Sequence, residues 1–279
     1  MPKMRNAVRG LIAVLAVGAL GLTLTGGAGR SAAAVDDSSV VKPTIVLVHG
    51  AWADGSSWSA VTERLQGRGY RVMVEPNPLR GLATDSAYLA GYLSSISGPL
   101  VLVGHSYGGA VITNAATGNP NVKALVYIDA FMPDAAESVV QLAAAKPGSG
   151  VAVADPSTVF DFVPIPGGGG NVDLYVKQEL FRQIFAADVR PGTAAVLAAS
   201  QRPLAASALD EPSGTPAWVS IPSWALIGTA DKVIPPAELE VMAARAKSHV
   251  VRIESSHLAM VSHPSDVTAI ITTAAKTVR

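Results

Sequence analysis

A Gly-x-Ser-x-Gly motif formed by Gly104, Ser106 and Gly108 lies near the middle of the chain. Residues 100–103 before it are an apolar run and residues 109–116 after it follow a small-residue helical pattern, which predicts a strand, a tight turn and a helix. On so sharp a turn, a Cβ two residues from the serine would clash with the adjoining strand and helix. The turn would hold the serine hydroxyl clear of the sheet at a helix N-terminus, which favours a developing anion. We therefore interpret Ser106 as a candidate nucleophile.

A serine hydroxyl is a poor nucleophile at neutral pH and needs a base, which in turn needs a group that fixes its tautomer. Of the five histidines, His257 is the favoured base, because it lies in a loop just after the last expected strand. His263, which precedes a proline near the start of the last helix, is the alternative. We expect His105 to point away from the serine hydroxyl, His49 to shape the loop after the first strand, and His249 to be superficial.

Two aspartates are candidates for the acid that orients the histidine. Asp231 follows an expected strand over residues 223–227 through a Gly-Thr-Ala turn, which leaves its carboxylate exposed towards the histidine loop. Asp129 also ends an expected strand and stays as the alternative, and an aspartate in either place can instead cap a helix or a turn. The order serine, aspartate, histidine along the chain is the one expected on this kind of sheet.

Two backbone N–H groups are expected to stabilise an oxyanion next to the serine. One is the N–H of Tyr107, directly after the candidate nucleophile, and the other is the N–H of Ala51, in the loop after the first strand. Loss of one such preorganised donor typically lowers the rate by about 10²-fold or more.

Apolar runs that read as buried strands alternate with helical patterns along most of the chain. The expected strands cover residues 44–48, 70–74, 100–103, 122–128, 223–227 and 249–253. This alternation predicts an α/β fold with a doubly wound, mostly parallel sheet and right-handed crossovers. Ligands bind such sheets beyond the carboxyl ends of the strands, where His49, Ser106 and Asp129 fall.

The alternation stops over about residues 132–216. Helical patterns are expected within this segment at residues 135–145, 172–185 and 193–200, separated by a Pro- and Gly-rich stretch at residues 147–170. No buried strand is expected there, so we interpret the segment as an inserted, mainly helical cap over the carboxyl edge of the sheet. Candidate lining residues of the site beneath it are Phe131, Phe160, Phe162 and Trp218.

The N-terminus has the pattern of a secretory signal peptide over residues 1–34. Residues 1–9 carry three basic side chains and no acid, residues 11–25 are apolar, and a small-residue run over residues 31–34 predicts cleavage near Ala34. The alternative is an uncleaved membrane anchor, for which the apolar stretch is short. No Arg-Arg pair is present, which favours general secretion over the twin-arginine route. We therefore expect an extracellular protein without stable membrane insertion after cleavage.

The composition excludes several classes of function. The chain has 279 residues, of which 49% are hydrophobic and 15% charged, enough for one large domain with a substantial core. Lys+Arg and Asp+Glu both count 21, so nothing suggests a nucleic-acid partner. The absence of cysteine excludes disulfides, thiolate catalysis and zinc–thiolate sites. The composition does not specify an oligomeric state.

The chain resembles the α/β-hydrolase superfamily over nearly all of residues 35–279, and within it the small-cap branch of plant methylesterases and hydroxynitrile lyases. The segments that match that branch are residues 47–52, 104–109, 228–231 and 256–260. The resemblance implies a triad of Ser106, Asp231 and His257, with Ala51 and Tyr107 as oxyanion donors.

The expected function is therefore carboxylic-ester hydrolysis through an acyl-enzyme, acting on a small-molecule ester without a metal or cofactor. The lyases of the resembled branch have a lysine directly after the catalytic histidine, whereas Leu258 stands here, which favours an esterase. A lyase or cofactor-free peroxidase that uses the same triad is one alternative, and a ligand-binding member without turnover is another. The residues leave the acyl and alcohol groups of the substrate open.

Overall fold

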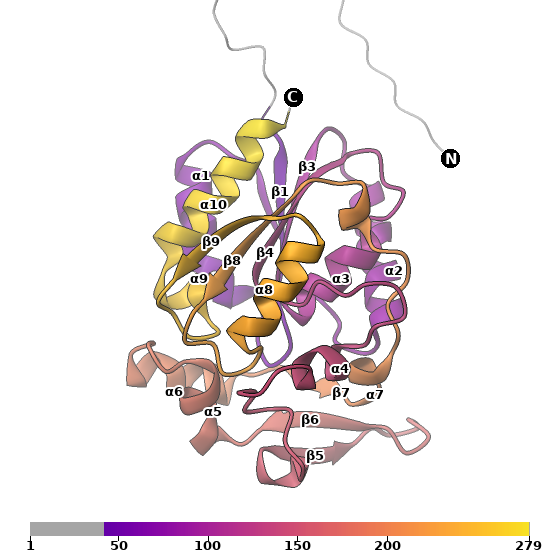
Figure 1. Cartoon of the computed structure of the whole chain (residues 1–279), viewed down its shortest axis with the longest axis vertical. Coiled ribbons are helices and arrows are strands. Elements are labelled where there is room, and N and C mark those ends of the chain that lie inside the picture. The colour runs from indigo at the N-terminus through magenta and orange to yellow at the C-terminus, as the bar shows by residue number, and fades with distance from the viewer. Residues whose placement is uncertain (1–41, 279) are drawn as a thin grey trace, which may run out of the picture. The chain divides into compact units, whose positions relative to one another are not determined.

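A six-stranded parallel sheet forms the centre of the computed structural model, which describes residues 42–278 (Figure 1). The strand order is β2-β1-β3-β4-β8-β9, and every neighbouring pair is parallel. The strands are β1 (Thr44–Val48), β2 (Val72–Glu75), β3 (Leu100–Ser106), β4 (Val122–Ala130), β8 (Ser223–Gly228) and β9 (His249–Ile253). The expected α/β fold with a doubly wound parallel sheet is confirmed. The expected signal peptide over residues 1–34 lies outside the described residues.

The central strands are apolar on both faces because helices cover both sides of the sheet. Every residue of β1 and β3 is buried, which is why each reads as a continuous apolar run rather than an alternating one. On one face α1 and α10 pack together, and on the other α2 packs against α3 (Figure 1). The helices are α1 (Ser59–Gly67), α2 (Leu82–Ser94), α3 (Tyr107–Ala115), α8 (Pro236–Arg245), α9 (Ala259–Ser262) and α10 (Pro264–Thr277), with 3-10 turns η1 (Gly55–Trp58) and η3 (Ala217–Val219).

The inserted segment carries a small antiparallel sheet as well as helices. Its elements are α4 (Val139–Ala144), η2 (Pro156–Thr158), β5 (Phe160–Pro164), β6 (Val172–Val176), α5 (Gln178–Phe185), α6 (Pro191–Ala199), β7 (Leu204–Ala205) and α7 (Ser207–Asp210). The strands pair in the order β5-β6-β7. The expectation that this segment lacks strands is therefore wrong, and the expected helix over residues 172–185 is a strand followed by a helix.

The physical reason for this difference is that the insertion's strands are short and only partly covered. In β5 only Phe160 is buried, and in β6 only Leu174 and Val176 are. The run of four glycines turns the chain between β5 and β6, and Gly167 and Gly170 there have φ of 73° and 97°. A positive φ is accessible to glycine at no steric cost, so this run forms a hairpin connection.

The insertion lies at the carboxyl end of the central sheet, as Figure 1 shows for β5, β6 and α4 to α7. Residues of α4, β5 and β7 line a cavity together with Ser106 at the end of β3. The position expected for a cap over this edge is therefore the one observed. Among residues 42–278, none of the helices combines the length and hydropathy that crossing a membrane requires.

Candidate active site

Ser106 lies on a strained turn between β3 and α3. Its φ of 52° and ψ of −125° are rare for a residue with a side chain, and α3 begins at the next residue. The neighbouring glycines allow this turn: a Cβ on Gly104 would lie 2.7 Å from the Gly108 carbonyl oxygen, and a Cβ on Gly108 would lie 2.7 Å from the Val48 carbonyl oxygen. The strand, turn and helix expected around the motif are confirmed, for the steric reason that the motif suggested.

Asp231 and His257 form a buried hydrogen-bonded pair. The His257 Nδ1–H donates to Asp231 Oδ2 over 2.8 Å, and both side chains are essentially inaccessible to solvent. The other carboxylate oxygen, Oδ1, accepts the backbone N–H groups of Val233 and Ile234 over 2.7 and 3.1 Å. Because these donors fix the carboxylate, Nδ1 of the imidazole carries the proton and Nε2 presents its lone pair.

The Nε2 atom of His257 is buried and has no hydrogen-bond partner within residues 42–278. The Ser106 hydroxyl of the described chain does not donate to this atom, and the hydrogen bonds of a serine–histidine pair commonly tighten only when substrate binds. His105, the residue before Ser106, contacts His257. The His105 Nε2–H donates to the His257 carbonyl over 3.0 Å, and the two rings lie 4.7 Å apart. Burial is the main reason that the pKa of His105 lies well below its usual range, and the nearby His257 lowers this pKa further.

The other histidines lie in different surroundings. His263 Nδ1 lies 3.5 Å from Asp188 Oδ2, in a partly exposed position that does not line the Ser106 cavity. His49 is buried with its Nδ1 2.9 Å from the Gly50 carbonyl oxygen, and burial lowers its pKa to about 4. His249 is exposed, as expected. His257 is thus the histidine that the structure pairs with a buried carboxylate.

Asp129, the alternative acid, is buried but bonds to no histidine of the described chain. Its Oδ1 accepts the backbone N–H of Gly228 over 2.6 Å, and its Oδ2 has no partner among residues 42–278. Burial, followed by the charge of nearby Asp231, holds its pKa well above the ordinary value. The two aspartates therefore lie close together, and only Asp231 contacts His257.

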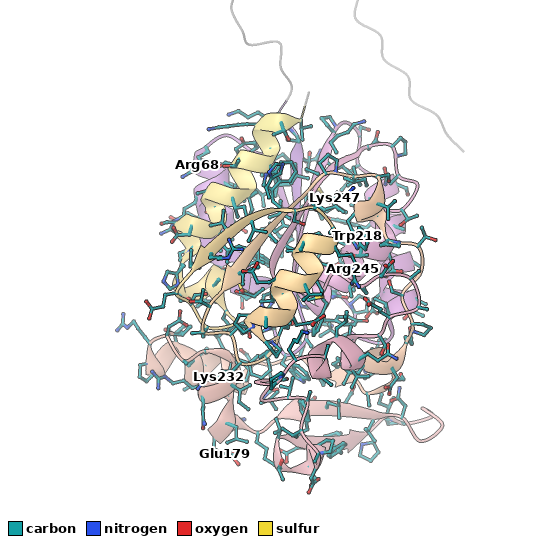
Figure 2. All side chains as sticks on the ribbon, in the orientation of Figure 1. Arg68, Glu179, Trp218, Lys232, Arg245 and Lys247 are labelled. Carbon is teal, nitrogen blue, oxygen red and sulfur yellow. The ribbon has the colours of Figure 1, made fainter. Side chains whose placement is uncertain are left out.

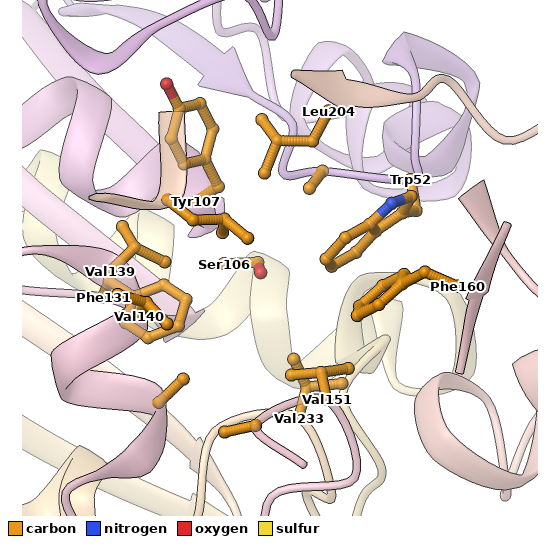
Figure 3. Close-up of a pocket in the computed structure, with 14 residues that line it drawn as sticks. Trp52, Ser106, Tyr107, Phe131, Val139, Val140, Val151, Phe160, Leu204 and Val233 are labelled. Atoms are coloured by element: carbon orange, nitrogen blue, oxygen red, sulfur yellow. The ribbon is translucent and has the colours of Figure 1, made fainter. Parts of the chain in front are cut away.

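A cavity opens in front of Ser106 (Figure 3). None of the 14 residues that line it has a charged side chain. Both expected oxyanion donors, Ala51 and Tyr107, are among them. The Tyr107 ring points away from Ser106, and its hydroxyl donates to buried Asp85 Oδ2 over 2.9 Å. The cavity therefore presents the serine hydroxyl within an apolar, uncharged lining.

The loop after β1 approaches the serine turn because Gly50 has no side chain. A Cβ on Gly50 would lie 2.6 Å from the Cβ of Ser106, a separation that real atoms do not reach. The carbonyl of His49, one residue earlier, accepts the side-chain N–H of Asn77 over 3.0 Å, which fixes the orientation of this loop. The backbone of Ala51 is thereby held beside the serine.

Trp52 joins the loop after β1 to the insertion. Its indole Nε1–H donates to the Leu174 carbonyl on β6 over 2.8 Å, and its backbone N–H donates to the Arg202 carbonyl over 3.0 Å. Its ring stacks on Phe160 of β5 at 5.2 Å (Figure 3). The sequence analysis did not identify this role, because Leu174 lies 122 residues away and no local pattern marks the contact.

Two of the four aromatic residues expected to line the site do so. Phe131 and Phe160 line the cavity. Phe162 is 46% exposed, because β5 is an edge strand whose residues after the first are uncovered. Trp218 lies elsewhere: its Nε1–H donates to the Pro133 carbonyl over 3.1 Å, and its ring lies 5.8 Å from the Arg245 guanidinium (Figure 2).

Parts of the chain are similar in sequence to curated proteins. The chain is 34% identical over 110 residues to the carbendazim hydrolyzing esterase of Nocardioides sp. (strain SG-4G), and 30% identical over 118 residues to Methylesterase 8 of Arabidopsis thaliana. The alignments cover 35% and 37% of this chain and 46% and 43% of those relatives, so the chain spans about half the length of the curated relatives it matches. The expected resemblance to plant methylesterases is thereby confirmed.

The fold comparison covers more of the chain. The crystal structure of polyneuridine aldehyde esterase superposes with a TM-score of 0.71 and 19% identity, over 84% of this chain and 99% of that one, which shows a common fold. The model of the Alpha/beta hydrolase family matches residues 45–270. This match spans most of the chain, including the Ser106 turn and the Asp231–His257 pair, and the chain therefore belongs to the alpha/beta hydrolase family.

Proposed function

We propose that this protein is a serine hydrolase that cleaves carboxylic esters of small molecules through an acyl-enzyme. The observation that carries the proposal is the buried Asp231–His257 pair, whose Nε2 has no partner among residues 42–278, together with the strained Ser106 turn in a member of a hydrolase family. The names of the relatives, an esterase and a methylesterase, support the same chemistry.

In the proposed reaction, the Ser106 hydroxyl attacks the ester carbonyl while His257 Nε2 takes its proton. Asp231 stabilises the imidazolium that forms. The N–H groups of Ala51 and Tyr107 bind the oxyanion of the tetrahedral intermediate. His257 then protonates the leaving alcohol, and in the second half it activates the water that releases the acid from Ser106.

The uncharged lining of the cavity supports a neutral ester with an apolar acyl group as the substrate class. A charged acyl chain would lose its hydration there without gaining a partner among the lining side chains. Leu258 is buried at the position where the resembled lyases have a lysine, which supports ester hydrolysis over cyanohydrin cleavage. Secretion after removal of residues 1–34 is part of the proposal and is supported by the sequence pattern alone.

A panel of p-nitrophenyl esters with neutral and carboxylate-bearing acyl groups tests the proposal. We expect hydrolysis of the neutral esters, and a loss of at least about 10⁴-fold in kcat in Ser106→Ala. Ser262→Ala is the matched control, because Ser262 contacts the second histidine, His263, over 2.9 Å. Its kcat should match that of the wild type. Cyanohydrin cleavage without ester turnover, or full activity of Ser106→Ala, would contradict the proposal.

A further inference from the structure

The side chain of Asp129 bonds to the turn that carries Asp231. We call residues 228–231 the Asp231 turn and residues 254–258 the His257 loop. Asp129 Oδ1 accepts the N–H of Gly228, the first residue of this turn, over 2.6 Å, and the Asp231 N–H in turn donates to the Gly228 carbonyl over 3.2 Å. A Cβ on Gly228 would lie 3.0 Å from the same carboxylate oxygen, so the contact is close.

The same carboxyl faces the backbone that follows the His257 loop. The N–H of Ala259 opposes part of the rise in the pKa of Asp129 that burial causes. Ala259 is two residues after His257 and begins α9, which packs against β4. Asp129 therefore bonds to the Asp231 turn, and its strand packs against the helix that follows His257.

The backbone at Asp129 also contacts the serine turn. The β3–β4 register pairs His105 with Ile128 and Ser106 with Ala130, so Asp129 is left out of the ladder as a bulge. Its φ of 45° is rare for a residue with a side chain, and such strain concentrates at functional sites. Two residues later, the Phe131 N–H donates to the Ser106 carbonyl over 3.2 Å.

Burial favours the neutral form of the Asp129 carboxyl. Burial and the nearby Asp231 raise the pKa of Asp129 well above its ordinary value, and Oδ2, which has no partner in the described part of the chain, is free to hold the proton. A neutral carboxyl adds no second negative charge beside Asp231. Its carbonyl oxygen accepts the Gly228 N–H as the oxygen of an asparagine amide would.

We propose that Asp129 is a positioning residue, which fixes the Asp231 turn and the start of α9 relative to the end of β4 and so holds Ser106, Asp231 and His257 in register. In this role it acts through the backbone and is not a substitute for Asp231 as the acid. The inference rests on the proposed function, because it assigns the three side chains their catalytic parts.

Kinetics of Asp129→Ala and Asp129→Asn on a neutral ester test the role. We expect Asp129→Ala to lower kcat by about 10- to 100-fold with little change in KM, because misplacement of the catalytic groups by a fraction of an ångström has effects of this size. Asp129→Asn should restore most of that loss and leave the pH dependence of kcat unchanged. An unaffected kcat in Asp129→Ala, or an Asn variant as slow as the Ala variant, would overturn the proposal.

A second pair of variants distinguishes a positioning role of Asp129 from a role as a replacement for the acid Asp231. We expect Asp231→Asn and the double variant Asp231→Asn/Asp129→Asn to have the same residual kcat within about threefold, since an amide keeps the Gly228 contact. If Asp129 served as a substitute acid, the double variant would lose the remaining activity, and that result would overturn the proposal.

Amide hydrogen exchange gives a readout that does not depend on turnover. The Gly228 and Ala259 amides should exchange faster in Asp129→Ala than in the wild type, and at nearly the wild-type rate in Asp129→Asn. Should the wild type hydrolyse no ester, the proposed function would fail while these rates still report whether the contacts exist. If Asp129→Ala does not fold, the Asp129→Asn variant provides the test. Fast exchange of the Gly228 amide in that variant would contradict the proposal, and exchange at the wild-type rate would support it.

Discussion

The Asp231 side chain has both carboxylate oxygens occupied, one by the His257 Nδ1–H and the other by two backbone N–H groups. An asparagine in its place would direct an amide N–H at Nδ1 or lose the backbone donors. The imidazole would then favour the tautomer with its proton on Nε2, which cannot accept the proton of Ser106. In the proposed reaction, the geometry of this one pair therefore decides whether Ser106 can be activated.

We predict that Asp231→Asn lowers kcat by about 10⁴-fold while KM changes little, because the tautomer is wrong and the cavity lining is intact. Steady-state kinetics on a neutral ester measure this. The control is Asp161→Asn, since Asp161 is an exposed carboxylate that pairs with Lys177 on the insertion. An equal loss in both variants would mean that the substitution acts through stability and not through the His257 tautomer.

At the scale of elements, the insertion is held to the sheet by Trp52, which bonds to β6 and stacks on β5. Trp52→Phe keeps a ring for stacking but removes the donor to the Leu174 carbonyl. We predict a KM raised by about five- to tenfold, the equivalent of one hydrogen bond of roughly 1 kcal/mol, together with faster amide exchange in β6.

Trp58→Phe is the control for this change, because the Trp58 Nε1 is buried without a hydrogen-bond partner in the part of the chain described here. Removing that N–H should leave KM at the wild-type value, while the smaller ring lowers the stability somewhat by leaving buried space unfilled. Equal effects of the two substitutions on KM would show that the indole–carbonyl bond does not hold the insertion.

The sequence predicted the central elements well and the insertion poorly, for a physical reason. Strands β1 and β3 are buried on both faces, so their apolar runs are continuous and need no knowledge of the partner strand. Strand β6 is five residues long, and its only buried positions are Leu174 and Val176. So short an alternation of buried and exposed residues does not distinguish a strand from the start of the helix that follows.

Some parts of the candidate site could likewise be predicted from the sequence, and others could not. Ser106 could be found because the steric demands of its turn select glycines at fixed spacing in the sequence. The choice between Asp231 and Asp129 required coordinates, because both end parallel strands and only the distance to His257 distinguishes them. The contacts of Tyr107 with Asp85 and of Trp52 with Leu174 connect distant segments and leave no local signal.

At the scale of the whole molecule, two buried titratable groups lie at the carboxyl ends of the neighbouring strands β1 and β2. Glu75, at the end of β2, is inaccessible to solvent, and neither carboxylate oxygen has a partner among residues 42–278. Burial, and to a smaller extent the charge of Asp85, raises the pKa of Glu75 to about 7. Burial lowers the pKa of His49 to about 4. Between about pH 4 and 7, both groups are therefore mostly neutral.

These shifts predict how stability depends on pH. The folded state binds the Glu75 proton more tightly than the unfolded state, so Glu75 lowers the stability as the pH rises from 4.5 to about 7 and adds no further slope above that. His49 has the opposite sign, since its pKa is lower in the folded state: its contribution rises between about pH 4 and 6.5. The two slopes oppose each other over most of this range.

Glu75→Gln isolates the first contribution. We predict that the free energy of unfolding of Glu75→Gln, minus that of the wild type, grows between pH 4.5 and about 7 and is constant at higher pH, with a slope of at most about 1.4 kcal/mol per pH unit. Urea unfolding at a series of pH values measures this difference. A difference that stays flat, or that falls as the pH rises, would mean that folding does not raise the pKa of Glu75.

The central claim is that Ser106 is the nucleophile, and covalent labelling tests it most directly. The purified protein is incubated with diethyl p-nitrophenyl phosphate, whose phosphoryl group is transferred to an activated serine with release of p-nitrophenol, and the adduct is located by peptide mass spectrometry. The account predicts one diethylphosphoryl group per chain, on Ser106, with loss of ester hydrolysis in proportion to labelling and no adduct in Ser106→Ala. A label on another residue that accompanies the loss of activity, or undiminished activity after complete labelling of Ser106, would contradict it.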